Sequence, residues 1–169
     1  SSDLLTTNSC TSALQLAVHM LKPESGRFRP TDEIIVTPMT CFASIAAILA
    51  NDCRVRWADV NPKTCNIDLT DVERKMNENT VGVMVVHWGG NPVDLERLKK
   101  IQLRFKELYN RDLPVIEDCA HCWDTEYART VKSMLNPNTA VVNSEIKVDR
   151  KSTRLNSSHT DISRMPSSA

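Results

Sequence analysis

The sequence predicts an α/β protein with three layers (αβα), in which helices cover both faces of a mainly parallel sheet. Short apolar segments alternate with helical patterns four times along the chain, as expected for βαβ units. Residues 81–88 are apolar almost without interruption, which is typical of a strand covered on both faces. Hydrophobic residues make up 41% and charged residues 25% of the 169 residues, as in globular proteins.

The first half of the chain predicts two helices and two strands. The helices are indicated by apolar residues at helical spacing, which are Leu14, Ala17, Val18 and Leu21 in the first and Phe42, Ile45, Ala46 and Leu49 in the second. The first strand, 33–37, is short and apolar and ends at Pro38. The second strand, 54–60, alternates in polarity and ends before Asn61 and Pro62.

The second half continues the same alternation. Thr70 and Glu73 have the spacing of a capping box, and the helix that they open carries Val72 and Met76 inward. A Gly-Gly-Asn-Pro turn follows the strand 81–88. A long helix comes next, with an apolar face formed by Leu95, Leu98, Ile101, Phe105 and Leu108. We expect residues 113–118 to form the last strand of the sheet.

The chain divides into a body, 1–149, and a tail, 150–169. The body contains no internal repeat or linker and fits one domain or most of one. The tail is rich in serine and follows no helix or strand period. It cannot bury enough apolar surface to offset its ordering entropy, so we expect it to be disordered. It also resembles translated adaptor sequence, and we expect it to be non-native.

Charge and composition indicate neither a nucleic-acid-binding protein nor a membrane protein. Basic and acidic residues both number 21, so no net charge indicates nucleic acid or a membrane as partner. The longest apolar run, 42–50, is far shorter than the roughly 20 residues that span a bilayer. No charged-then-apolar leader opens the chain. The six cysteines lie in apolar or strand-like contexts, which indicates free thiols in a reducing compartment. We therefore expect a cytoplasmic protein.

The segment Val115–His121, with the sequence VIEDCAH, is the most informative candidate site. Glu117 and Asp118 end an apolar strand, and ligands of α/β proteins collect at the carboxyl ends of parallel strands. A carboxylate at the edge of a core needs a partner, and a cationic heterocycle nitrogen would be one. The alternative is an acid that caps the next helix. His87 and Trp88 end the preceding strand and belong to the same rim.

The beginning of the first helix is a second candidate. Residues 8–11, Asn-Ser-Cys-Thr, supply small hydroxyl side chains, and the N–H groups of a helix N-terminus favour an anion such as phosphate. An ordinary N-cap is the alternative. Phe42 opens the next helix, where it could stack on a planar ligand or belong to the core.

Five segments resemble, in order and spacing, the DegT/DnrJ/EryC1/StrS family of pyridoxal-phosphate-dependent sugar aminotransferases. The segments are TNSCTSAL (7–14), DEIIVTPMTCFAS (32–44), WADVNPKTCNID (57–68), VVHWGGNPVDLERL (85–98) and PVIEDCAHCWDTEY (114–127). The resemblance covers about residues 6–127. It implies the aspartate-aminotransferase fold, so that the body would be part of the large domain of a fold-type I enzyme that binds pyridoxal 5'-phosphate.

The resemblance also implies which residues hold the phosphate and the ring of the cofactor. Cys10 and Thr11 match the backbone and hydroxyl groups that bind the cofactor phosphate in the family. Phe42 matches the aromatic residue that stacks on the pyridine ring. Ser44 matches a small hydroxyl residue beside that ring.

Asp118 and His121 match the residues that contact the polar atoms of the ring. Asp118 matches the acid that pairs with the pyridine nitrogen, and His121 matches the Gln or His that contacts the phenolic oxygen. A carboxylate at Asp118 would keep the ring nitrogen protonated, and a protonated ring withdraws electrons from the reacting substrate carbon. The resemblance further implies a nucleotide-linked keto sugar as substrate, glutamate as amino donor and a homodimer.

The sequence departs from the family pattern after Tyr127. The family continues to a Ser-Phe segment and a Schiff-base lysine, which no segment here matches. Lys147 lies at about the right distance from Asp118, but its surroundings differ, and a surface lysine is the alternative. The given sequence shows no match to the family's C-terminal domain. We therefore expect a truncated fragment that does not transaminate by itself. A non-catalytic homologue with a binding or regulatory role fits the missing lysine as well.

Cys119 and Cys122 suggest a different class of function. They form a CxxC directly after a strand, a pattern that also occurs in thiol redox proteins. Glu117 and Asp118 adjoin the pair and would raise the pKa of a thiol, which disfavours that function. A zinc site is a weaker hypothesis still, because structural zinc takes four ligands in paired spacings and no second CxxC exists.

Overall fold

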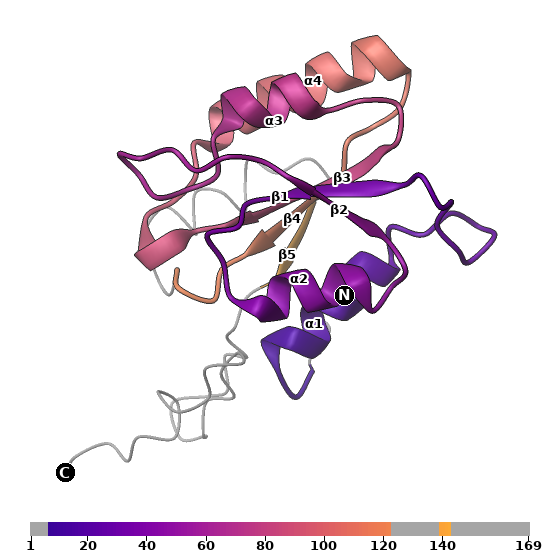
Figure 1. Cartoon of the computed structure of the whole chain (residues 1–169), viewed down its shortest axis with the longest axis horizontal. Helices are drawn as coiled ribbons and strands as arrows, with labels where there is room; N and C mark the ends of the chain where they lie inside the picture. Colours follow the sequence, from indigo (N-terminus) through magenta and orange to yellow (C-terminus); the bar gives the residue numbers. More distant parts are fainter. Residues whose placement is uncertain (1–6, 123–138, 143–169) are drawn as a thin grey trace, which may run out of the picture.

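The computed structural model describes residues 7–122 and the backbone of 139–142. Five parallel strands form one sheet in the order β2-β1-β3-β4-β5 (Figure 1). The strands are β1 Glu33–Val36, β2 Arg54–Trp57, β3 Thr80–Val86, β4 Val115–Asp118 and β5 Thr139–Val142. The helices are α1 Cys10–His19, α2 Phe42–Leu49, α3 Leu69–Lys75, α4 Leu95–Tyr109 and the single 3₁₀ turn η1 Trp88–Gly90.

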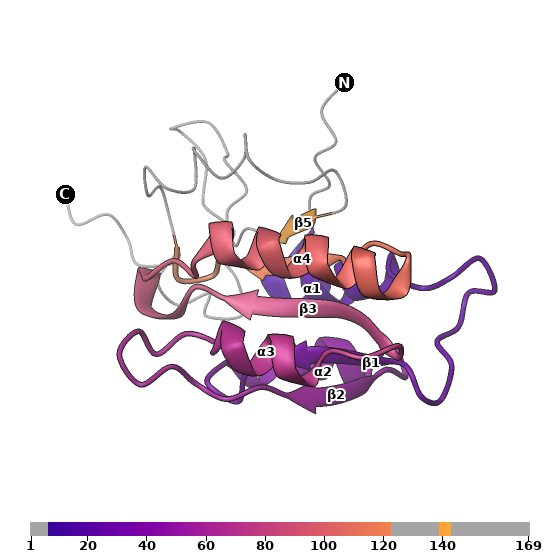
Figure 2. The ribbon, with the colours of Figure 1, turned by 90° about the horizontal axis from the view of Figure 1, so that it is seen from above.

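Helices cover both faces of the sheet, so the predicted three-layer α/β fold is confirmed. Figures 1 and 2 show α1 and α2 on one face and α3 and α4 on the other. Side chains alternate along each strand, and each face therefore has its own hydrophobic core. Ile116 of β4 packs in the core under α1 and α2, whereas its neighbour Val115 packs in the core under α3 and α4.

Strand β5 corrects the expectation that residues 113–118 form the last strand. Thr139–Val142 pairs in parallel with β4, with Thr139 beside Val115 and Val142 beside Asp118. Four residues are too few to show a period, so this strand could not be identified from its sequence pattern. Pairing is favoured because the backbone N–H and C=O groups of β4 would otherwise lack partners on that side.

Helix α2 turns a different face inward from the one predicted. Its buried residues are Ser44, Ala47 and Ile48, whereas Phe42 is 74% exposed and Leu49 is 52% exposed. The helix is apolar on nearly every side, so its hydrophobic pattern cannot indicate which stripe faces the sheet. In α4 the prediction is confirmed for Leu98, Ile101 and Phe105, which are buried, but Leu108 is 58% exposed.

The beginning of α3 also differs from the prediction. Asp68, and not Thr70, is the N-cap, because its backbone is extended and its carboxylate accepts the N–H of Thr70. Thr70 therefore lies inside the first turn. Val72 and Met76 point into the core as predicted. Strand β2 ends at Trp57, three residues earlier than expected.

None of the helices within the described residues has the length and apolar composition that crossing a bilayer requires. Lys147 and the tail 150–169 lie outside the described residues, and so does the boundary proposed at residue 149.

Candidate functional site

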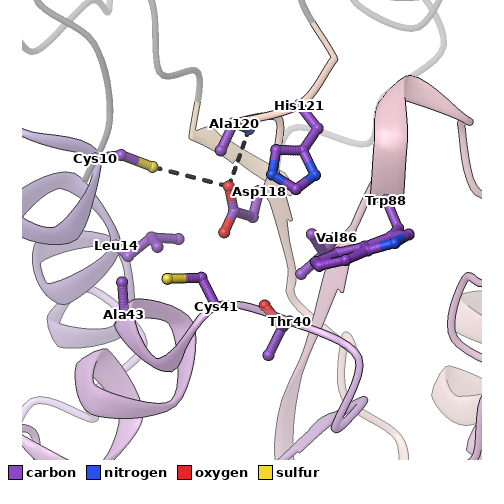
Figure 3. Close-up of a pocket in the computed structure, with 10 residues that line it drawn as sticks. All are labelled: Cys10, Leu14, Thr40, Cys41, Ala43, Val86, Trp88, Asp118, Ala120 and His121. Carbon is purple, nitrogen blue, oxygen red and sulfur yellow. Dashed lines mark hydrogen bonds between the residues drawn. The ribbon is translucent and has the colours of Figure 1, made fainter. Parts of the chain in front are cut away.

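A small pocket lies at the carboxyl ends of β3 and β4, where ligands of parallel α/β sheets collect. Residues from the start of α1, the loop before α2, and the ends of β3 and β4 line it (Figure 3). The lining residues are Cys10, Leu14, Thr40, Cys41, Ala43, Val86, Trp88, Asp118, Ala120 and His121. Segments that are distant in sequence therefore meet at the rim that the sequence predicted.

Asp118 is the charged residue at the floor of this pocket. It is 4% exposed, and three donors surround its carboxylate. The backbone N–H of Ala120 donates to Oδ1 at 3.0 Å, and the Cys10 thiol donates to the same oxygen at 3.8 Å. The hydroxyl of Ser44 donates to Oδ2 at 3.0 Å. All three of these groups donate hydrogen bonds to Asp118, which fits a carboxylate that only accepts. The pocket therefore offers a negative charge to a ligand.

The start of α1 lies beside Asp118. Ser9 is the N-cap and accepts the N–H of Ser12, so this end of the helix is capped in the ordinary way. The Cys10 side chain is buried and faces Asp118. Burial first, and then the charge of Asp118, raises the pKa of the Cys10 thiol far above its ordinary value. Cys10 therefore remains a thiol that donates. Thr11 is half-buried and does not line the pocket.

A glycine turn places Trp88 and His121 opposite α1. Gly89 and Gly90 have φ of 61° and 82°, a left-handed conformation that glycine adopts without strain. Asn66 fixes the turn by accepting the N–H of Trp88 at 3.0 Å. Gly89 N–H donates to Nδ1 of His121 at 3.2 Å, and the rings of Trp88 and His121 meet edge to face with centroids 5.0 Å apart. A neutral His121 therefore carries its proton on Nε2.

Phe42 does not join this group. Its side chain is 74% exposed at the start of α2 and does not line the pocket, whereas the preceding residue, Cys41, does. The structure thus brings Cys10, Ser44, Asp118 and His121 together and leaves Phe42 outside. Stacking of Phe42 on a ring stays a prediction that this position does not support.

The sequence did not single out Thr40 and Cys41. Thr40 lines the pocket and its Oγ1 lies 2.8 Å from the hydroxyl of Ser44. The sequence signal that could have identified Thr40 is its spacing of four residues from Ser44 at the start of a helix, because residues four apart lie on the same side of a helix. Trp88 was assigned to the rim from the sequence, and in the structure it lines the pocket.

Glu117 lies on the opposite face of the sheet from Asp118. It is 1% exposed, and its Oε2 is 3.1 Å from Nε2 of His87. The N–H of Val93 donates to Nδ1 of His87 at 3.1 Å, so His87 has its proton on Nε2 and donates it to Glu117. Among the described residues, no group donates to Glu117 Oε1.

Cys119 lies close to this pair, and together the three residues bring potential metal ligands within 4.8 Å of one another. The hydrogen bonds of His87 argue against a metal there. A metal on Nε2 would require a proton on Nδ1, which faces the N–H of Val93. The arrangement therefore fits a hydrogen-bonded brace between the ends of β3 and β4.

The CxxC pair has the environment of structural thiols. Cys119 and Cys122 are 6% and 3% exposed. Burial, followed by the charge of Glu117, raises the pKa of the Cys119 thiol far above its ordinary value. A redox cysteine needs an accessible thiolate, and Cys119 has neither the access nor the charge state.

Comparisons with known proteins identify a family. The model of the DegT/DnrJ/EryC1/StrS aminotransferase family matches residues 2–136. The chain is 32% identical over 122 residues to GDP-perosamine synthase of Escherichia coli O157:H7, covering 72% of this chain and 30% of that protein.

Two solved structures share the fold. The sugar aminotransferase CalS13 from Micromonospora echinospora is 39% identical with a TM-score of 0.64, over 69% of this chain and 31% of that one. NtdA from Bacillus subtilis, solved with bound pyridoxamine phosphate (PMP), is 29% identical with a TM-score of 0.58, over 68% of this chain and 24% of that one.

The chain spans about 30% of the length of the curated relatives that it matches, as its 30% coverage of GDP-perosamine synthase shows. The part matched by the family model contains strands β1 to β4 of the sheet and every residue that lines the pocket. By sequence and by fold, this chain belongs to the DegT/DnrJ/EryC1/StrS aminotransferase family.

Proposed function

We propose that the chain supplies the cofactor pocket of an aminotransferase that uses pyridoxal 5'-phosphate to aminate a nucleotide-linked keto sugar. The observation that carries this proposal is Asp118, a buried carboxylate at the end of β4 that faces a pocket beside a helix N-terminus. The donor set fits the cofactor, because a carboxylate suits a protonated ring nitrogen and a helix N-terminus suits a phosphate. When bound, the cofactor supplies an electron-withdrawing ring.

Several residues in and beside the pocket have roles that their chemistry permits. Asp118 would accept a hydrogen bond from the protonated ring nitrogen and so keep that nitrogen protonated. The N–H groups of Cys10 and Thr11, at the start of α1, would bind the phosphate, since Ser9 already accepts the N–H of Ser12. His121, with its proton on Nε2, donates to the phenolic oxygen. Trp88 forms a flat apolar wall of the pocket.

The sugar substrate, the amino donor and the subunit arrangement involve more of the protein than the described residues. We propose that the chain acts as part of a longer cytoplasmic protein that forms a homodimer and takes its amino group from glutamate. The names of relatives, such as GDP-perosamine synthase, support a sugar nucleotide as substrate. The Schiff-base lysine has no assigned position, because Lys147 lies outside the described residues.

Titration of the chain with PMP tests the proposal. We expect Asp118→Asn to weaken binding roughly tenfold to a hundredfold, because it removes a hydrogen bond to a charged group. Asp52→Asn makes the same chemical change at an exposed position and should leave affinity unchanged. Circular dichroism should show that both variants keep the fold. Wild-type affinity in Asp118→Asn would rule out the assigned role of this carboxylate.

A further inference from the structure

Within the part of the chain that the structure describes, the hydrogen bonds to the Asp118 carboxylate leave one acceptor site for a ligand. Oδ1 already accepts the N–H of Ala120 and the thiol of Cys10. Oδ2 accepts the hydroxyl of Ser44. A carboxylate offers about four lone-pair sites, two on each oxygen. The site that remains is on Oδ2, the oxygen that Ser44 already contacts.

The contact between Thr40 and Ser44 has a definite direction. A hydroxyl group has one hydrogen, and Ser44 uses it on Asp118. Thr40 must therefore be the donor in the 2.8 Å contact between the two hydroxyl oxygens. Ser44 is completely buried, so a water molecule cannot easily replace either partner. The two hydroxyl groups form a chain that ends on Oδ2 of Asp118.

We propose that Ser44 is a positioning residue that, with Thr40 behind it, orients Asp118 so that Oδ2 accepts the ring N–H of the bound cofactor. The inference rests on the proposed function. Without Ser44, the direct contacts from the described residues that restrain the carboxylate all act on Oδ1, and one of them is a weak 3.8 Å thiol bond. Oδ2 would then be free to turn away from the ring nitrogen. The contribution of Ser44 therefore depends on a ring nitrogen being present.

Two probes separate this role from a general structural one. The first is PMP, and the second is its 1-deaza analogue, in which CH replaces the ring nitrogen. Fluorescence titration of the full chain with each probe gives two affinities per variant. We expect Ser44→Ala to weaken PMP binding roughly tenfold, as for loss of one hydrogen bond to a charged group. Affinity for the deaza analogue should stay unchanged.

Two further variants complete the experiment. Thr40→Val keeps the side-chain shape and removes the second hydroxyl, so we expect a smaller loss of roughly threefold, again for PMP alone. Ser25→Ala makes the same change as Ser44→Ala on an exposed loop and should alter neither affinity. If Ser44→Ala does not fold, Thr40→Val decides the question, because it lies in a half-buried loop.

Equal affinity of Ser44→Ala and the wild type for PMP would overturn the inference, and so would an equal loss for both probes. For Thr40→Val, a loss confined to PMP supports the inference, and no loss or an equal loss contradicts it. Failure of the proposed function gives a different result. In that case the wild-type chain itself binds the two probes equally well, and Asp118→Asn changes neither affinity.

Discussion

Glu117 and Asp118 are adjacent acids that the sheet sends to opposite faces. Glu117 lies under α3 and α4, where it meets His87 in a closed core. Asp118 lies under α1 and α2, where it meets three donors at the floor of a pocket. Both are almost completely buried. The difference shows that burial of an acidic side chain does not by itself indicate a ligand site. The carboxylate must also have an oxygen lone pair that faces a pocket which a ligand can enter.

The helices on the two faces of the sheet also differ in whether they bury apolar or polar side chains. On the α3 and α4 face, apolar side chains of the long helix α4, such as Phe105, fill a continuous core. On the other face, α2 keeps Phe42 and Leu49 on its outer surface and turns the hydroxyl of Ser44 inward. One face therefore serves mainly stability, and the other positions polar groups. Three predictions test this division, beginning with the largest expected effect.

The first prediction compares the same substitution on the two faces. Phe105 is fully buried, so Phe105→Ala should lower the free energy of unfolding by about 4 kcal/mol through lost burial and a cavity. Phe42→Ala should change it by less than about 0.5 kcal/mol, because the side chain is 74% exposed. Urea denaturation followed by circular dichroism measures both. If the two variants lost similar amounts of unfolding free energy, the two faces would not differ in their contribution to stability.

The second prediction concerns two histidines. His87→Ala removes the donor that Glu117 meets in the core and should cost about 3 kcal/mol of unfolding free energy. His121→Ala should cost less than about 1 kcal/mol, because water can reach the N–H of Gly89 that His121 accepts. The same denaturation experiment gives both values. If His121→Ala proved the more costly, the brace between β3 and β4 would have no special importance.

The third and smallest prediction concerns Asp71 of α3. Burial alone would raise its pKa, but hydrogen bonds from Lys75 and Arg74 outweigh burial and hold the pKa well below its ordinary value. Because the folded-state pKa is lowered, Asp71 contributes stability above the unfolded-state value, about 3.9, and loses it as pH falls further. Asp71→Asn should therefore cost about 1 kcal/mol at pH 7.

The difference in stability between the wild type and Asp71→Asn should shrink as pH falls from about 5 toward 2. Urea denaturation at several pH values measures this difference directly. Asp52→Asn, at an exposed position, provides the control for the change of net charge. A difference that stays constant over this pH range would show that the ion pairs of Asp71 do not stabilise the fold.

Particular elements show how far the sequence could predict the fold. Strand β3 and helix α4 were predicted because long segments have a clear apolar pattern. The inward face of α2 was predicted wrongly, because a helix that is apolar all round has no preferred stripe. Strand β5 was missed, because its pairing depends on the edge that β4 presents and not on its own four residues.

In the candidate site, too, some residues could be predicted from the sequence and others could not. Asp118 and His121 were identified from the sequence, since their positions after a strand and their match to the family segments are local properties. Thr40 and Cys41 were not, and Phe42 was chosen in place of its neighbour. A helix start rotates each successive residue by about 100°, so a one-residue difference decides which side chain lines the pocket.

The sequence by itself determined the alternation of strands and helices, the parallel sheet and the family, because these follow from periodicity and from ordered motifs. Only the tertiary structure decided that Glu117 meets His87 on the opposite face, and which oxygen of Asp118 keeps a free lone pair among the described residues. It also decided that Ser44 and Thr40 act on that oxygen. These features depend on the directions of side chains from segments 74 and 108 residues apart in the sequence, and hydrogen bonds across such separations leave no pattern in any single segment.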